Sequence, residues 1–199
     1  LVGSEMCIRD RNKETGLIPT GGRRLVSQCG IFEYEGRFVM ITDAAINIAP
    51  DVETQIGIVE NALPVARALG IDCPKVAVLS AVENVTDKMP STVSAKEIAE
   101  RGVEGCVISG PLALDGAISM ESVKHKAIHD PVAGQADILL VPFIEIGNVL
   151  YKACTYIAGK TMASTICGAS CPVIITSRAD TPDSKYYSIL MAVLRCLKA

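Results

Sequence analysis

The stretch ADILLVPFIEIGNVLYK, residues 136–152, decides the fold class of this chain. After Asp137, residues 138–141 form a short, continuously apolar run, as in a strand buried on both faces of a parallel sheet. The following residues place apolar side chains at helical spacing, and we expect a helix over residues 147–158. A buried strand followed directly by a helix is the repeating unit of α/β proteins.

The same alternation of short apolar runs and longer periodic segments continues from about residue 25 onward. Glu35-Gly36 separates the first two runs and predicts a hairpin turn. No proline- or serine-rich linker divides the chain, so we expect one continuous α/β unit. Strands are predicted at residues 28–34, 37–42, 75–80, 105–109, 137–141, 163–166 and 172–176.

Helices are predicted between these strands. Residues 52–69 carry an apolar face, and Pro64 is expected to kink this helix or to divide it into two. The sequence from Ser94 to Glu97 has the spacing of a capping box, which predicts a helix start there and an end at Gly102. Further helices are predicted over residues 119–128, 147–158 and 183–197.

The composition is that of a soluble globular protein. The chain has 199 residues, 49% hydrophobic and 21% charged, with a net charge of −3, and this length suits one domain or one and a half. The longest apolar run, residues 138–142, is too short to cross a bilayer. With no Trp, three Phe and five Tyr, the chain lacks the basic and stacking residues of nucleic-acid binders.

Eight scattered cysteines indicate free thiols and a reducing, cytoplasmic compartment. Cys167 and Cys171 lack the spacing of zinc or redox sites. His125 and His129 are four residues apart, but no Glu lies between them and no third ligand is evident. The chain also lacks the glycine-rich motifs of dinucleotide sites and P-loops. We therefore predict neither a metal nor a bound cofactor.

The chain begins with Leu1 rather than Met, and residues 3–11 resemble translated adapter sequence. We expect residues 1–12 to be a non-native tail, the domain to occupy residues 13–199, and the whole to be a fragment of a longer chain.

The densest group of polar residues follows the strand predicted at residues 137–141. In an open α/β sheet, ligands bind at loops that leave the carboxyl ends of strands. Gly147 and Asn148 are expected at the start of the next helix, where their N–H groups could face an anion. The alternative is that Asn148 is a cap and the charged residues are solvated. The remaining candidates in this segment are Glu145, Tyr151 and Lys152.

A second group follows the strand predicted at residues 172–176. A hydroxyl beside a guanidinium, as in Ser177-Arg178, suits a tetrahedral anion because Arg presents a fork that matches phosphate oxygens. Asp180 and Asp183 are candidates for a general base, or for helix caps.

Two further loops leave strands in the same way. Asp43 and Asn47 follow the strand at residues 37–42, and residues 109–115 follow the strand at residues 105–109. Four polar loops at strand ends predict one cleft lined from several sides.

These loops together resemble the phosphate acetyltransferase and phosphate butyryltransferase family, and its butyryl branch more closely. The order and spacing of the shared motifs match the family over roughly residues 17–194. The motifs are TDAAINIAP at residues 42–50, GPLALD at residues 110–115, AGQADILLVP at residues 133–142 continuing into E-x-G-N-x-x-Y-K at residues 145–152, and TSRAD at residues 176–180.

The resemblance implies a three-layer α/β/α architecture with a mostly parallel sheet, like that of isocitrate and isopropylmalate dehydrogenases, of which this chain holds one domain and part of a second. It implies an enzyme that transfers a butyryl or acetyl group between coenzyme A and inorganic phosphate by direct transfer, as a homo-oligomer. Acyl-CoA and phosphate are then its partners, with coenzyme A a substrate rather than a cofactor.

By the same resemblance, Ser177 and Arg178 hold the phosphate and the reacting carbonyl. The acetyl branch has a catalytic Asp seven residues after that Ser, where this chain has Ser184, so Asp180 or Asp183 is the expected base. The expected substrate-binding residues are Asp43, Asn47, Glu145, Gly147, Asn148, Tyr151 and Lys152.

The chain departs from the family in two respects. Phe143 stands where the family usually has Asp. The family chain is also longer at its N-terminal end, so we expect the fragment by itself to be inactive. The alternative function is a non-catalytic acyl-CoA-sensing domain of a malic-enzyme-type fusion.

Overall fold

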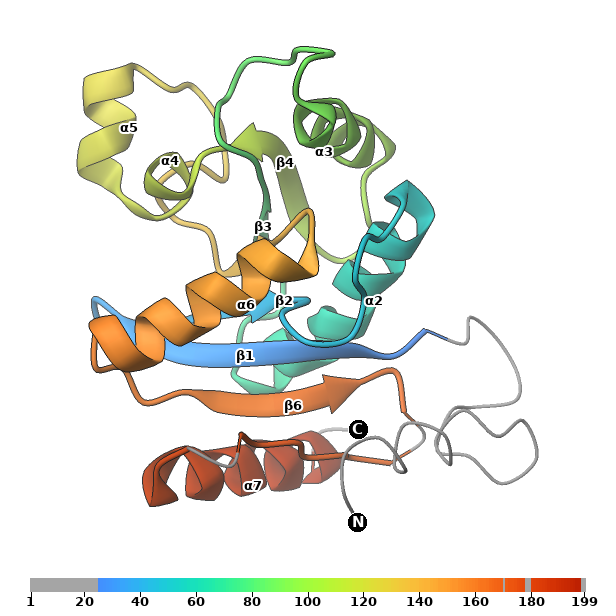
Figure 1. Cartoon of the computed structure of the whole chain (residues 1–199), viewed down its shortest axis with the longest axis vertical. Helices are drawn as coiled ribbons and strands as arrows, with labels where there is room; N and C mark the ends of the chain where they lie inside the picture. The colour runs from blue at the N-terminus through green and yellow to red at the C-terminus, as the bar shows by residue number, and fades with distance from the viewer. Residues whose placement is uncertain (1–24, 170, 178–179, 198–199) are drawn as a thin grey trace.

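The computed structural model describes residues 25–169, 171–177 and 180–197, and the statements below concern these residues. Its strands are β1 (Ser27–Tyr34), β2 (Arg37–Thr42), β3 (Lys75–Leu79), β4 (Val107–Leu112), β5 (Ile138–Leu140) and β6 (Ala163–Cys167). They form one six-stranded sheet in the order β4-β3-β5-β2-β1-β6 (Figure 1). β1 is antiparallel to both of its neighbours, and the other three pairings are parallel. The sheet is therefore mostly parallel, as predicted.

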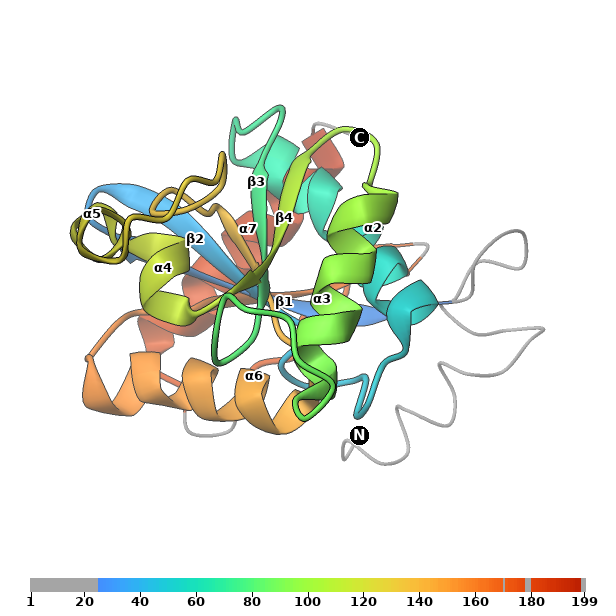
Figure 2. The same ribbon diagram turned by 90° about the horizontal axis from the view of Figure 1, so that it is seen from above.

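The helices are α2 (Val52–Ala68), α3 (Pro90–Arg101), α4 (Leu114–Ile118), α5 (Met120–Lys126), α6 (Ile144–Lys152), a π-helical turn η1 (Ala153–Ile157) and α7 (Pro182–Leu197). They cover both faces of the sheet (Figure 2). One apolar layer includes Ile98 of α3 and Met191 of α7, and the other includes Leu150 of α6. In β5, Ile138 belongs to the first layer and Leu139 to the second, which is why this strand is apolar at every position.

Most predicted strands are confirmed within two residues. The predicted hairpin turn is also confirmed, since Glu35 and Gly36 both have positive φ angles, 49° and 78°. β4 lies further along the chain than predicted and ends at Leu112. The strand predicted at residues 172–176 is wrong, because only Val173 bridges to β6, opposite Ile166. An apolar run forms a strand only where a neighbour pairs with it over several residues.

Two helix predictions are corrected. Pro64 does not divide α2, which is one helix from Val52 to Ala68, whereas a kink at this residue stays a prediction. Pro64 lies on the exposed side of the helix, where water can satisfy the carbonyl group that proline leaves without a partner. α3 begins at Pro90, ahead of the predicted capping box, since proline is well suited to the first turn. Ser94 donates to the carbonyl of Pro90 inside this helix. The predicted end at Gly102 is confirmed.

The helices predicted at residues 119–128 and 183–197 lie close to their predicted positions. The segment predicted as one helix over residues 119–128 is α5, capped by the Ser119 side chain, and α4 precedes it. α7 begins one residue earlier than predicted. In the part of the chain that the structure describes, no helix combines the length and apolar character needed to span a membrane. The predicted non-native tail lies outside the described residues.

Candidate active site

The loop after β2 is folded around the carboxylate of Asp43. This side chain is buried, and its Oδ1 accepts hydrogen bonds from the backbone N–H groups of Ala45 and Ile46 at 2.9 and 3.1 Å. Its Oδ2 accepts from the backbone and side-chain amides of Asn47 at 3.1 and 2.6 Å. Burial raises the pKa of Asp43, whereas the hydrogen bonds oppose that rise by favouring the charged form. Both oxygens are thus occupied within the loop, and Asp43 fixes the shape of residues 43–47.

Asn47 extends this network to the beginning of β1. Its side-chain Nδ2 also donates to the carbonyl of Val26 at 2.9 Å. The amide therefore joins the loop after β2 to the chain that enters the neighbouring strand, and this accounts for an Asn four residues after Asp43.

Helix α6 packs directly against the same loop. The side-chain amide of Asn148 donates to the carbonyl of Ala44 at 3.3 Å. A Cβ at Gly147 would lie 2.7 Å from the carbonyl oxygen of Asp43, so the helix approaches the loop this closely only because residue 147 is glycine. Two of the segments selected from the sequence therefore meet.

The predicted position of Gly147 and Asn148 at the N-terminus of this helix is wrong. α6 begins three residues earlier, at Ile144, and the N–H of Gly147 donates to the carbonyl of Phe143 at 3.2 Å. Phe143 caps the helix without a side-chain hydrogen bond, so the usual polar signal of a helix start is missing from the sequence. The N–H of Gly147 is consequently not free to bind an anion.

The ring of Tyr151 packs against β1. A Cβ at Gly30 would lie 2.6 Å from Cε2 of Tyr151, so the ring occupies the space that the glycine leaves. Burial first, and then the negative charge of Asp180, raise the pKa of Tyr151 to about 12. Asp180 is therefore near enough for its charge to act on Tyr151 of α6. Gly30 was not selected from the sequence, although a glycine within a strand often marks a close approach.

Ser177 and Asp180 form a reciprocal turn. The N–H of Ser177 donates to Oδ2 of Asp180 at 2.7 Å, and the N–H of Asp180 donates to the carbonyl of Ser177 at 3.1 Å. Arg178, the predicted phosphate ligand, lies outside the described residues. The structure therefore describes three of the four polar residues of the TSRAD motif, Thr176, Ser177 and Asp180.

The start of α7 decides the capping question for Asp183. Asp183 is exposed in the first turn, and the cap is Thr181, whose Oγ1 accepts from the N–H of Ser184 at 3.2 Å. The Ser184 hydroxyl is buried and accepts from the N–H of Met162 at 3.3 Å. Residue 184 thus fastens α7 to the chain that enters β6.

The remaining predicted residues are less enclosed. Glu145 and Lys152 are exposed on α6. The loop predicted at residues 109–115 is partly strand, because β4 continues to Leu112. Ser109 therefore lies within β4, where its hydroxyl is hydrogen-bonded to the carboxylate of Asp130. Asp130 was not selected from the sequence, although Asp followed by Pro commonly starts a turn. No group of three His, Cys, Asp or Glu within the described ranges is arranged to hold a metal ion.

The sequence pattern of the family described as Phosphate acetyl/butaryl transferase matches residues 11–193. This chain belongs to that family. The membership confirms the resemblance seen in the four motifs, and it extends across every segment of the candidate site described above.

Individual relatives of the family agree. The chain is 47% identical to a phosphate butyryltransferase of Clostridium beijerinckii over 189 residues, which are 92% of this chain and 62% of the relative. It is 43% identical to a phosphate acetyltransferase of Thermotoga maritima over 162 residues, covering 79% of this chain and 55% of that one. The chain therefore spans less than two thirds of the length of these relatives.

A solved structure of the family has the same fold. The crystal structure of a branched-chain phosphotransacylase from Enterococcus faecalis V583 matches with a TM-score of 0.85 and 41% identity, over 93% of this chain and 67% of that chain. In the present member of the family, the loop after β2, α6 and the Ser177–Asp180 turn form the candidate active site.

Proposed function

We propose that the intact protein transfers a short-chain acyl group, butyryl or acetyl, between coenzyme A and inorganic phosphate. The observation that carries this proposal is the contact between two polar segments, the loop after β2 and α6, through Asn148 and Gly147 in a member of the transferase family. The relatives described above are named as acyltransferases, and the alternative of an acyl-CoA-sensing domain draws no support from them.

In this proposal, phosphate binds at the turn that carries Ser177 and Arg178. The guanidinium of Arg178 orients the phosphate dianion for attack on the thioester carbonyl and offsets charge in the tetrahedral transition state. The Ser177 hydroxyl donates to the developing oxyanion. The reaction requires no metal, bound cofactor or acyl-enzyme, because phosphate itself is the nucleophile and the coenzyme A thiolate is the leaving group.

The opposite direction needs a base, because a thiol with a pKa of about 8.5 is mostly protonated at neutral pH. Asp180 and Asp183 remain the two candidates. Asp180 is the better placed of the two, since its charge acts on Tyr151 of α6 and its backbone position is fixed by Ser177. Asp183 is exposed one turn further along.

The proposed binding residues divide into two groups. Asp43, Asn47, Gly147 and Asn148 hold the loop and the helix together, and we assign them to shaping the substrate surface. Glu145, Tyr151 and Lys152 lie on α6 and are assigned to contacts with acyl-CoA. The exposed side chains of Glu145 and Lys152 are available for such contacts.

The architecture beyond this chain is part of the same proposal. α7 exposes large apolar side chains, with Ile189 55%, Val193 48% and Leu197 77% accessible. We assign this face to burial against the second domain of a dehydrogenase-like two-domain enzyme or against another subunit of a homo-oligomer. In the same proposal, the domain over residues 13–199 is the C-terminal two thirds of the whole protein, and the protein is cytoplasmic.

The test uses the full-length parent protein in an assay of phosphate-dependent thiol release from butyryl-CoA and acetyl-CoA. Arg178→Ala is expected to lower kcat about 100-fold or more, because a charge that faces the transition state is lost. Arg101→Ala is the matched control, since Arg101 pairs only on the surface with Glu53 and Glu97 and should keep full activity. Acyl-CoA binding without any thiol release would support the sensing domain instead.

A further inference from the structure

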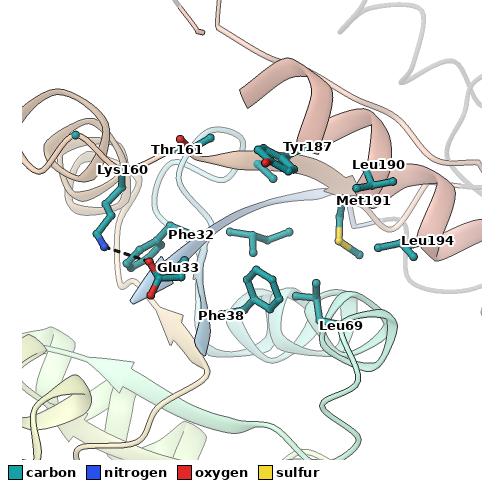
Figure 3. A pocket seen from close by; sticks show the side chains of 13 residues that line it. Phe32, Glu33, Phe38, Leu69, Lys160, Thr161, Tyr187, Leu190, Met191 and Leu194 are labelled. Carbon is teal, nitrogen blue, oxygen red and sulfur yellow. Dashed lines mark ion pairs between the residues drawn. The ribbon is translucent and has the colours of Figure 1, made fainter. Parts of the chain in front are cut away.

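A cavity of about 580 Å³ lies between α7, the end of α2 and the β1–β2 hairpin (Figure 3). It opens where β1 continues past the start of β6. The pairing of these two strands ends at Ile31 opposite Ala163, so the rest of β1, up to Tyr34, extends beyond β6. The volume is within the range of small-molecule sites, about 300–1,000 Å³.

The cavity is distinct from the candidate active site. Phe38, which lines it, stands near the beginning of β2, whereas Asp43 follows the end of that strand. The two sites therefore lie at opposite ends of the sheet, and a ligand in the cavity would not be a substrate at the Ser177–Asp180 turn.

The walls of the cavity are apolar at one end and charged at the other. Figure 3 shows Leu190, Met191 and Leu194 of α7 on one side, and Lys160 reaching Glu33 on the other. Nζ of Lys160 lies 3.5 Å from Oε2 of Glu33. Such a lining matches a ligand with an apolar tail and a single charged head.

The contacts of the ion pair indicate the sign of that head. Glu33 has a second partner, the N–H of Gly36, which donates to its Oε1 at 2.6 Å, and this hydrogen bond is the main reason that the pKa of Glu33 is lowered. Glu33 is therefore held by the hairpin whether or not Lys160 is present. The ammonium group of Lys160, at the longer distance of 3.5 Å, can turn to another anion without leaving a carboxylate unpartnered.

We propose that this cavity binds a carboxylate with a straight apolar tail, such as a fatty acid. The carboxylate pairs with Lys160, and the tail lies among the leucines of α7 and Leu69 at the end of α2. Burial of the tail supplies most of the binding free energy, because it removes apolar surface from water.

The test uses the 199-residue chain with its methionine methyl groups labelled with ¹³C, titrated with octanoate. Met191 lines the cavity, so its methyl resonance is expected to shift, whereas that of Met89 is expected to stay in place. Octan-1-ol, which has the same tail without the charge, is expected to bind more weakly than octanoate.

Three variants sharpen the result. Lys160→Met keeps the aliphatic part of the side chain and removes the charge, so octanoate should bind about fivefold more weakly and octan-1-ol unchanged. Lys185→Met, an exposed lysine of α7 outside the cavity, is the matched control and should alter neither. Leu194→Trp fills the apolar end and should weaken both ligands.

Several results would overturn the proposal. One is the absence of any Met191 shift, and another is an equal loss of octanoate and octan-1-ol binding in Lys160→Met. A third is that sedimentation shows a dimer from which octanoate is excluded, since a second copy would then cover the cavity. Tighter binding of octylammonium than of octanoate would reverse the assigned charge.

Discussion

The loop after β2 and the segment that carries Ser177 belong to one candidate site, but they are held in different ways. The loop is fixed by four hydrogen bonds to the buried Asp43 and by the close approach of Gly147. In the described part of the other segment, Val173 bridges to β6 and Ile175 is 45% exposed. The first half of the site, the loop after β2, is thus organised by packing within this chain, whereas the described part of the second half, the segment that carries Ser177, is more exposed.

The largest effect on stability is expected from removing the carboxylate of Asp43, around which the loop after β2 is folded. Asp43→Ala leaves the N–H groups of residues 45–47 without their acceptor, and we expect a loss of about 3 kcal/mol in the free energy of unfolding. Urea denaturation of the chain measures this. Asp183→Ala, an exposed carboxylate of the second half, is the matched control and should change stability by less than about 0.5 kcal/mol. Equal losses in the two variants would contradict the comparison.

The difference in stability between the natural chain and Asp43→Ala is also expected to depend on pH. The pKa of Asp43 is raised in the folded state, so its contribution to the free energy of unfolding is largest when the carboxyl group is protonated. That contribution decreases as the pH rises through the pKa of the folded state. The stability gap between the natural chain and Asp43→Ala should therefore be widest in acid and narrow toward neutral pH. A gap that widens with rising pH would show that the hydrogen bonds outweigh burial.

A smaller loss is expected at the contact between the helix and the loop. In Gly147→Ala the added methyl gains about 1 kcal/mol of helix propensity, but it overlaps the backbone of residues 43 and 44. We expect a net loss of about 1–2 kcal/mol in urea denaturation. Val149→Ala, on the exposed side of the same helix, should change stability by less than about 0.5 kcal/mol. An unchanged stability of Gly147→Ala would mean that the helix can move away from the loop at no cost.

The smallest effect is a change in the pKa of Tyr151, which tests whether Asp180 lies near α6. Because the charge of Asp180 helps to raise the pKa of Tyr151, Asp180→Asn should lower that pKa slightly below its value of about 12. The difference in alkaline absorbance between each protein and its Tyr151→Phe version isolates this tyrosine. Asp183→Asn should leave the titration unchanged. If Asp180→Asn has no effect either, the Ser177–Asp180 turn does not lie beside α6.

The sequence correctly predicted that the motifs around residues 43 and 145 come together. It could not predict which groups the individual side chains of these motifs would contact. Asp43 and Asn47 were interpreted as ligands for substrate, and both prove to be engaged with backbone groups of their own loop and of Val26. Whether a polar side chain faces a ligand or its own backbone depends on the path of the loop, which local spacing does not specify.

The sequence by itself determined the α/β class, the hairpin turn at Glu35-Gly36, the two strands on either side of that turn and the family, because these follow from local periodicity, turn chemistry and motif order. Only the tertiary structure decided three further features. They are the start of α6 at Ile144, the contact between Tyr151 and Gly30, and the failure of residues 172–176 to form a strand. Each depends on a neighbour distant in the sequence, and the free energy of such contacts exists only once the chain has brought the partners together.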